Sequence, residues 1–264
     1  MTIAIDVKKL NFSYKTMPVI DNISFCVKKG EFFVIIGPNG SGKTTLMKTI
    51  SGIEKFKKGK MNILNKSVKK YSKRMLAKKI AFVPQTVPID FPFTVTEMVL
   101  TGRAPYLGIF GFEGKKDIKI AKDAIAFTEI EHIADRKLNQ LSGGERQRAF
   151  IARAICQKPQ IILLDEPTAS LDLAHQIKVM DLMEKLKIEK GITVVMVSHD
   201  LNLASMYGDT ILLLKKGKIK SIGCPKEVIT YDILKKTYNC ELYLDTSPMG
   251  KFPRITLIPG KYSR

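Results

Sequence analysis

The stretch that most constrains this chain is residues 37–45, GPNGSGKTT. It follows the apolar run Glu31–Ile36 and precedes a helical pattern, and its first eight residues fit the phosphate-loop pattern G-x-x-x-x-G-K-[ST]. Glycines in such a loop let backbone N–H groups approach phosphates, and the helix N-terminus adds positive potential. A ligand-free turn is the alternative, which pattern and context together disfavour. The nucleotide-binding residues predicted here are Gly37, Pro38, Asn39, Gly40, Ser41, Gly42, Lys43, Thr44 and Thr45.

Two residues of this loop have expected chemical roles. We expect the Lys43 ammonium to bridge the β- and γ-phosphates and the Thr44 hydroxyl to bind magnesium. ATP and Mg²⁺ are therefore the expected ligands.

The apolar pattern of the chain predicts an α/β domain. Short, nearly continuous apolar runs are typical of strands buried on both faces of a parallel sheet, and a helical pattern separates two of them at 171–189. Residues 3–27 alternate apolar and polar residues in short runs, which predicts antiparallel strands with one buried face. The apolar runs are Glu31–Ile36, Ile80–Val83, Ile161–Leu164 and Ile192–Val197.

A Pro- and Phe-rich stretch followed by helical sequence predicts an inserted helical subdomain at about 88–157. The expected fold is a P-loop NTPase core with a mixed or parallel sheet, an antiparallel β subdomain and this insertion. We assign residues 1–240 to one ATP-binding domain and 241–264 to a short, irregular tail; the core and antiparallel strands take 1–87 and 158–240.

Polar residues follow three further apolar runs, as the phosphate loop follows the first. Because ligands bind at the carboxyl ends of parallel strands, we expect these side chains at one site. Asp165 can hold magnesium through its bound water, and Glu166 can polarise the water that attacks the γ-phosphate. His199 can contact the γ-phosphate and orient that water, and Gln85 can contact the metal and the water. Taken singly, each residue has an alternative interpretation: Gln85 as an exposed loop amide, Asp165 as a helix cap and His199 as a surface imidazole.

The stretch LSGGERQR at 141–148 presents a second glycine-rich helix start. Ser142 and Glu145 have the spacing of a capping box, in which each side chain binds the backbone N–H of the other residue. Capping does not explain Gly143 and Gly144, because glycine costs about 1 kcal/mol in a helix and is useful where a ligand approaches the backbone.

The composition limits the partners that this chain can have. Lys and Arg number 44 against 25 acidic residues, a net charge of +19, but only eight are Arg and the lysines are dispersed. A solvated lysine-rich surface therefore explains the charge at least as well as nucleic-acid binding does. The four cysteines lack metal-ligand spacing, so we expect them reduced in a cytosolic setting. No apolar run approaches the ~18 residues of a membrane span, and no signal peptide is evident.

The ordered motifs resemble those of the ATP-binding subunits of ABC transporters. GPNGSGKTT resembles the Walker A loop, LSGGE the signature, IILLDEP Walker B and Ser170–Asp172 the D-loop; Gln85 resembles the Q-loop glutamine and His199 the switch histidine. Tyr14 resembles the aromatic residue that stacks on adenine, although its strand pattern fits a core or edge aromatic nearly as well.

The resemblance implies a head-to-tail dimer of two copies, in which the signature of one copy closes on the ATP of the other. Ser142, Gly143, Gly144 and Asp172 would then face the partner's nucleotide. Glu145 stands where many members of the family have Gln. A P-loop kinase is a remote alternative, because it has no use for the signature or the switch histidine.

Three further segments resemble the ATPases of iron-siderophore, haem and cobalamin importers: Val99–Gly108, Leu171–Gln176 and Ser198–Ala204. The ATPases of zinc and manganese importers have much of the same sequence in these segments. The resemblance implies a separate membrane permease docking near residues 86–112, an extracytoplasmic substrate-binding protein acting indirectly, and a peripheral location at the cytoplasmic face of the membrane. The alternative outside transport is a soluble ABC ATPase that acts in iron-sulfur assembly or in association with nucleic acid, although nucleic acid is not the expected partner.

Overall fold

The chain divides into two units, and the computed structural model describes residues 2–85, 92–108, 111–169 and 171–262 of it. Unit 1 comprises Met1–Val68 and Thr193–Arg264, and unit 2 comprises Lys69–Ile192. Of the predicted segments, residues 86–91 and 109–110 of the docking region and Ser170 of the D-loop lie outside the described residues.

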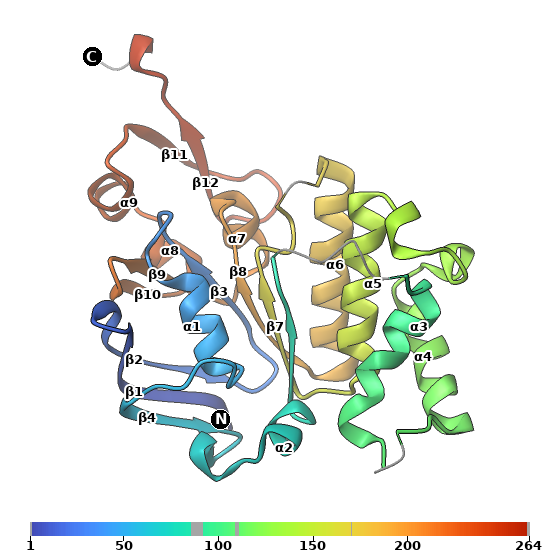
Figure 1. Ribbon diagram of the computed structural model, residues 1–264. Coiled ribbons are helices and arrows are strands. Elements are labelled where there is room, and N and C mark those ends of the chain that lie inside the picture. Colours follow the sequence, from blue (N-terminus) through green and yellow to red (C-terminus); the bar gives the residue numbers. More distant parts are fainter. Residues whose placement is uncertain (1, 86–91, 109–110, 170, 263–264) are drawn as a thin grey trace. The chain divides into compact units, whose positions relative to one another are not determined.

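Buried parallel strands form the centre of unit 1 (Figure 1). Strand β3 (Phe32–Ile36) pairs in parallel with β8 (Thr193–Val197) and with β9 (Thr210–Lys215), and β10 (Lys218–Gly223) pairs antiparallel with β9. Every residue of β3 and β8 is buried, which explains why both strands are almost continuously apolar. Helix α1 (Lys43–Ile50) follows β3 after the phosphate loop. These pairings confirm the predicted parallel strands.

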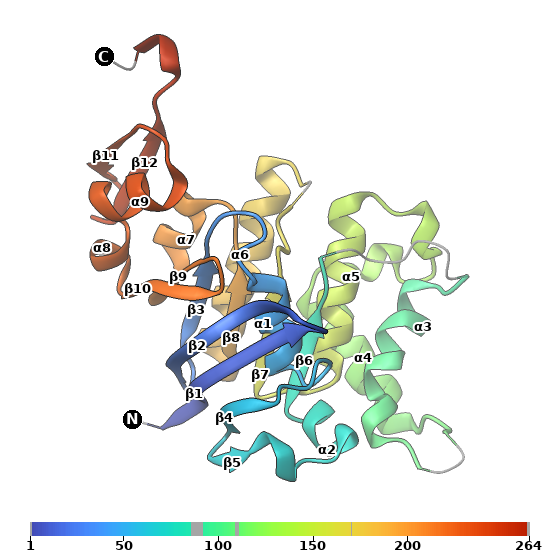
Figure 2. The same ribbon diagram turned by 60° about the vertical axis from the view of Figure 1, so that its left-hand side comes forward.

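An antiparallel sheet of order β2-β1-β4-β5 completes the core of unit 1 (Figure 2). Its long strands are β1 (Ile3–Tyr14) and β2 (Met17–Lys28), and its shorter ones are β4 (Lys58–Ile63) and β5 (Lys66–Ser67). Buried and exposed residues alternate along the second half of β2, with Ile23, Phe25 and Val27 inside. The prediction of antiparallel strands with one buried face is confirmed.

The C-terminal part of unit 1 is more regular than predicted. Strands β11 (Leu242–Thr246) and β12 (Pro253–Leu257) form an antiparallel hairpin, so the expectation of an irregular tail is wrong (Figure 2). The side chain of Asn202 binds both the N–H and the carbonyl of Ile255, at 2.8 and 3.1 Å. The helices of this part are α7 (Leu201–Tyr207), α8 (Pro225–Val228), α9 (Tyr231–Tyr238) and the 3-10 turn η5 (Gly260–Tyr262).

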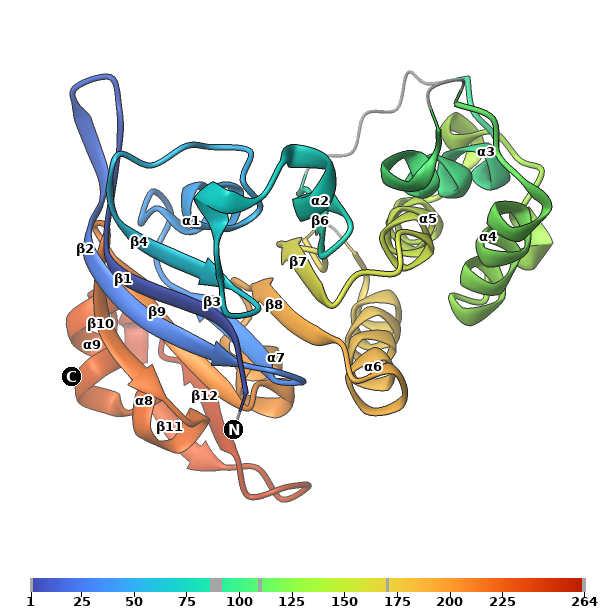
Figure 3. The ribbon, with the colours of Figure 1, turned by 90° about the horizontal axis from the view of Figure 1, so that it is seen from below.

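Unit 2 combines a parallel strand pair with a group of helices. Strands β6 (Ile80–Val83) and β7 (Ile161–Asp165) pair in parallel. Helices α3 (Val95–Leu100), α4 (Lys115–Phe127) and α5 (Gly143–Cys156) pack on one another (Figure 3). The remaining elements are η1 (Val68–Lys70), α2 (Lys73–Ala77), η2 (Thr101–Tyr106), η3 (Glu131–Ile133), η4 (Leu138–Gln140) and α6 (Leu173–Lys190).

The elements agree with the predicted α/β class with antiparallel and helical additions, whereas the boundaries of the insertion, about 88 and 157, stay a prediction. Within the described ranges, no helix combines the length and the apolarity needed to cross a bilayer.

Candidate functional site

The phosphate loop joins β3 to α1 and depends on two glycine positions. Gly42 caps α1 with φ 101°, a conformation that side chains rarely adopt. At Gly37 an added Cβ would lie 2.0 Å from the carbonyl oxygen of Leu214. The buried Lys43 ammonium donates to the carbonyl oxygens of Gly37 and Pro38 at 2.8 and 3.0 Å. The loop is therefore held closed by the lysine that was predicted to bind phosphate.

A buried hydroxyl in this loop suits an anionic ligand. Ser41 is 3% exposed, and its Oγ has no hydrogen-bond partner among the described residues. A buried polar atom of this kind is costly unless a ligand or water completes it. The positive helix end and an available hydroxyl donor together fit a phosphate group.

Two predicted residues of unit 1 lie outside the loop itself. His199 is exposed and follows β8, which pairs with β3 through Val197 and Ile35, so His199 and the phosphate loop follow neighbouring strands. Tyr14 ends β1 and is 42% exposed, and its hydroxyl donates to Glu54 at 3.2 Å. Tyr14 is therefore an edge aromatic rather than a core residue.

Unit 2 brings Gln85 and Glu166 into direct contact. They follow β6 and β7, which pair through Val83 and Leu164. The Gln85 amide Nε2 donates to Glu166 Oε2 at 2.5 Å. Glu166 is 9% exposed and has φ 54°, a left-handed conformation that is uncommon for non-glycine residues and recurs at functional sites. Asp165, the last residue of β7, is 2% exposed. The two acidic residues lie buried at the carboxyl end of a parallel strand.

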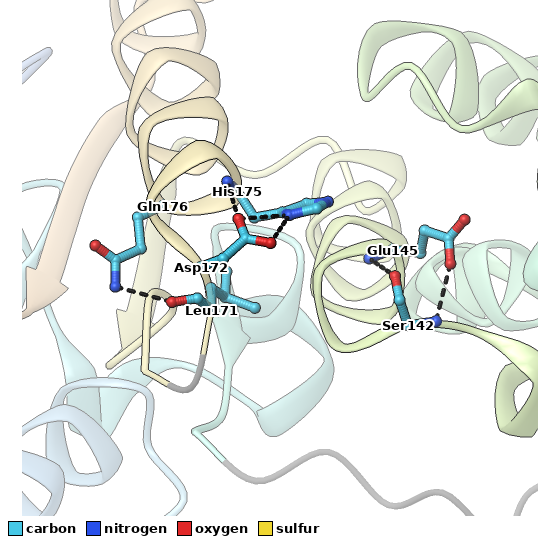
Figure 4. Close-up of polar contacts among 6 residues, drawn as sticks. All are labelled: Ser142, Glu145, Leu171, Asp172, His175 and Gln176. Carbon is cyan, nitrogen blue, oxygen red and sulfur yellow. Dashed lines mark hydrogen bonds and ion pairs between the residues drawn. The ribbon is translucent and has the colours of Figure 1, made fainter.

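The signature segment begins helix α5 as predicted. Ser142 is the N-cap; its Oγ accepts from the N–H of Glu145 at 3.3 Å, and its own N–H donates to Glu145 Oε2 at 2.8 Å (Figure 4). The predicted capping box is confirmed. The hydrogen bond from the Ser142 backbone lowers the pKa of Glu145, so this carboxylate is ionised at neutral pH and is engaged by its own helix.

Asp172 of the D-loop caps the next long helix, α6. Its Oδ1 accepts from the backbone N–H of His175 at 2.8 Å, and the ring Nδ1 of His175 lies 2.8 and 2.9 Å from its two carboxylate oxygens (Figure 4). The side-chain amide of Gln176 donates to the carbonyl of Leu171 at 3.0 Å. Two consecutive residues of α6 thus hold the preceding loop.

Residues Val99–Gly108, one of the segments that resemble importer ATPases, contain η2 and contact helices α4 and α5. Buried Arg103 pairs through Nε with Asp117 Oδ1 at 2.9 Å and donates through Nη1 to the Cys156 carbonyl at 2.9 Å. A Cβ at Gly102 would lie 2.3 Å from the Arg153 carbonyl oxygen, so this position requires glycine for packing. Gly102 and Arg103 therefore pack in the interior of unit 2.

Sequence reasoning missed the roles of two residues. His175 lies within the segment Leu171–Gln176, but no role was predicted for it. The pattern that could have indicated one is the spacing Asp-x-x-His at the start of a helix. Tyr238 ends α9, and the backbone of Gly37 forms a hydrogen bond with its hydroxyl, while burial raises the pKa of that hydroxyl. No local pattern points to Tyr238, because 201 positions separate it from Gly37.

Comparison with known proteins identifies the family. The family model described as ABC transporter matches residues 20–169. The iron(3+)-hydroxamate import ATP-binding protein of Bacillus subtilis (strain 168) is 37% identical over 95% of this chain and 93% of its own length. The hemin import ATP-binding protein of Thermobifida fusca (strain YX) is 35% identical over 96% of this chain and 88% of its own length.

Solved structures agree with this result. A transporter described as being of the metal-chelate type, in an inward-facing conformation, contains a chain that matches with a TM-score of 0.87, 30% identity and 99% coverage of both chains. A dimeric bacterial ABC transporter cassette matches with a TM-score of 0.74 and 36% identity, over 83% of this chain and 98% of that chain. The protein is accordingly an ATP-binding subunit of the ABC transporter family, and as such an ATPase.

Proposed function

We propose that this ATPase powers the uptake of a metal chelate, an iron-siderophore, haem or cobalamin-type compound, through a separate membrane permease. The observation that carries the proposal is the likeness, over nearly the whole chain, to hydroxamate and hemin import proteins and to the metal-chelate type transporter. The substrate class rests on these relatives.

Hydrolysis is proposed to use Glu166 as the residue that polarises the attacking water. Its burial and left-handed backbone fix the carboxylate at the end of β7, and the bond from Gln85 orients one of its oxygens. Lys43 would exchange its two carbonyl partners for phosphate oxygens when ATP binds, and His199 would orient the water. Tyr14, exposed at the end of β1, would stack on the adenine.

Magnesium is proposed to be held by Thr44, Asp165 and Gln85, which supply the oxygen ligands that this ion prefers. When bound, the ion neutralises charge that develops on the phosphate oxygens. The described residues hold no cluster of three or more His, Cys, Asp or Glu side chains that could bind a metal ion.

A second copy of the chain is proposed to complete each ATP site. The exposed N-terminus of α5, where Gly143 lies in the first turn, would present the positive end of the helix to a phosphate. At the start of α6, Asp172 and the apolar Leu173, which is 80% exposed, would lie in the same interface. The dimeric cassette among the similar structures supports this arrangement.

The permease is proposed to dock near residues 86–112, and the subunit is proposed to lie peripherally at the cytoplasmic face of the membrane. Phe93 and Phe112, at 37% and 84% exposure, are the apolar side chains available there among the described residues.

The test is the variant Glu166→Gln, purified from native membranes with ATP and its associated proteins identified. We expect turnover to fall by at least about 100-fold with ATP binding retained, and a multi-span permease with a chelate-binding protein to co-purify. Unchanged turnover would refute Glu166 as the catalytic base. Recovery of a zinc or manganese permease, or nucleic-acid-stimulated ATPase activity with steep salt dependence, would refute the substrate class.

A further inference from the structure

The two glycines of the signature segment have different surroundings. A Cβ at Gly144 would lie 2.3 Å from Cδ2, 2.7 Å from Cγ and 3.0 Å from Nε2 of His175. A Cβ at Gly143 would have its nearest neighbour at 3.9 Å, an ordinary contact with Leu171. The imidazole of His175 therefore occupies the space that a side chain at position 144 would need. Figure 4 shows this ring extending from α6 toward the start of α5.

Backbone conformation does not explain Gly144. Both signature glycines lie in the first turn of α5 and neither has a positive φ. Alanine forms helices better than glycine, so a glycine in this position needs another reason. Close approach of a ligand is one reason for Gly143, which is exposed, whereas Gly144 is buried. The His175 ring supplies the missing reason for Gly144.

Asp172 fixes the orientation of that ring. Hydrogen bonds from the backbone and side chain of His175 lower the pKa of Asp172, so the carboxylate is ionised and only accepts hydrogen bonds. The Nδ1 atom of His175, within 2.9 Å of both carboxylate oxygens, must then carry a proton. With Nδ1 directed at Asp172, the opposite edge of the ring, Cδ2 and Nε2, faces Gly144.

We propose that His175 is a positioning residue that couples the D-loop to the signature segment. Asp172 orients the imidazole, and the imidazole sets the position of the Gly143–Gly144 backbone, so both segments meet the partner's ATP as one rigid surface. The functional half of this inference rests on the proposed two-copy ATP site, whereas the packing half concerns a single chain.

The packing half is tested by thermal unfolding of the nucleotide-free protein with matched variants. Gly143→Ala leaves the melting temperature unchanged or raises it, because space is open there. Gly144→Ala lowers it by about 3 °C or more, because the ring must leave its place. The double variant Gly144→Ala/His175→Ala melts above Gly144→Ala alone. Equal melting of the two single alanine variants at 143 and 144, or a double variant no better than Gly144→Ala, would overturn the proposal.

The functional half is tested with His175→Ala in a Glu166→Gln background, at a temperature where the nucleotide-free chain is fully folded. The ATP concentration for half-maximal dimerisation rises about tenfold, because the signature backbone is displaced. Binding of a fluorescent ATP analogue to the monomer stays within twofold, since the phosphate loop is not altered. Unchanged dimerisation, or an equal loss in both measurements, would overturn the positioning role.

A substitution that keeps only part of the His175 contact separates the two steps. His175→Asn retains a side-chain donor for Asp172 but is too short to fill the space beside Gly144, so it should dimerise as poorly as His175→Ala. Dimerisation equal to the parent would show that the ring contact is dispensable and overturn the proposal. Absence of ATP-dependent dimers in the parent Glu166→Gln protein would refute the two-copy site instead, and the melting series would still decide the packing contact.

Discussion

The phosphate loop and the signature segment are both glycine-rich helix starts, yet they are built differently. In the loop, Gly42 has φ 101° and Lys43 bonds to the loop's own carbonyls. In the signature, the glycines are helical and Ser142 and Glu145 satisfy each other. The first is a loop whose conformation requires glycine and whose lysine binds its own carbonyl groups, and the second is a capped helix.

The difference indicates what each segment contributes. The loop has a buried hydroxyl without a protein partner at Ser41, so a ligand can complete it. The signature segment has its first-turn donors partly satisfied by its own cap, and its shape is set from outside by His175. A single chain therefore contains one site that a ligand can complete and, in the proposed two-copy arrangement, one surface that would meet the ATP of a second copy.

The largest expected effect on ATPase activity comes from removing the positive charge of the phosphate loop, because the signature segment contributes no such charge to the chain's own nucleotide. Lys43→Ala removes the only positive side chain in the loop, so ATPase activity should fall by at least about 100-fold together with ATP binding. Gly143→Ala, the matched change in the signature, should leave ATP binding to the monomer unchanged. Steady-state ATPase assays and equilibrium titration with a fluorescent ATP analogue measure both. Retention of a tenth of the activity in Lys43→Ala would contradict the role of this lysine.

An intermediate effect distinguishes the two serines. Ser142→Ala removes the N-cap of α5 and should cost about 1 kcal/mol of unfolding free energy without weakening ATP binding to the monomer. Ser41→Ala removes a buried hydroxyl that has no protein partner in the described chain, so stability should hold or rise slightly while ATP affinity falls. Urea unfolding and ATP titration of the two variants provide the measurement. If both serines affected stability equally, the contrast between the segments would be wrong.

The smallest effect concerns Glu145. Its folded-state pKa is lowered by the Ser142 hydrogen bonds, so its stabilisation is fully present above the unfolded pKa of about 4.3 and is lost as pH falls through the folded-state pKa. Glu145→Gln keeps the cap geometry and should keep turnover within about twofold at pH 7. The advantage of the parent over the variant in urea unfolding should shrink from pH 6 to pH 3. A complete loss of activity would mean that this carboxylate does more than cap its helix.

Local patterns predicted the parts of the molecule that depend on neighbouring residues. The capping box needs only Ser142 and Glu145, and the buried strands need only continuous apolar runs, so both were found from the sequence. The ordered motifs likewise led to the family that the comparisons show.

Contacts between distant residues could not be predicted in this way. His175 lies 31 positions after Gly144, and no periodicity links them before the helices pack. The prediction of an irregular tail was wrong because its two strands are only five residues long. The hydrogen bond between Ile255 and Asn202, which fixes the second strand, joins residues far apart in the sequence. Gly102 is likewise required by a distant group, the carbonyl oxygen of Arg153.

The central claim is that the signature segment serves the ATP of a second copy. Sedimentation of Glu166→Gln with ATP and Mg²⁺ tests it directly, against Glu166→Gln/Gly143→Asp as control. Aspartate suits the first turn of α5 and keeps the helix stable, but its charge repels a phosphate arriving from a partner. We predict a species of twice the monomer mass for the first protein with ATP and monomer for the second. Monomer in both, or dimer in both, would contradict the account.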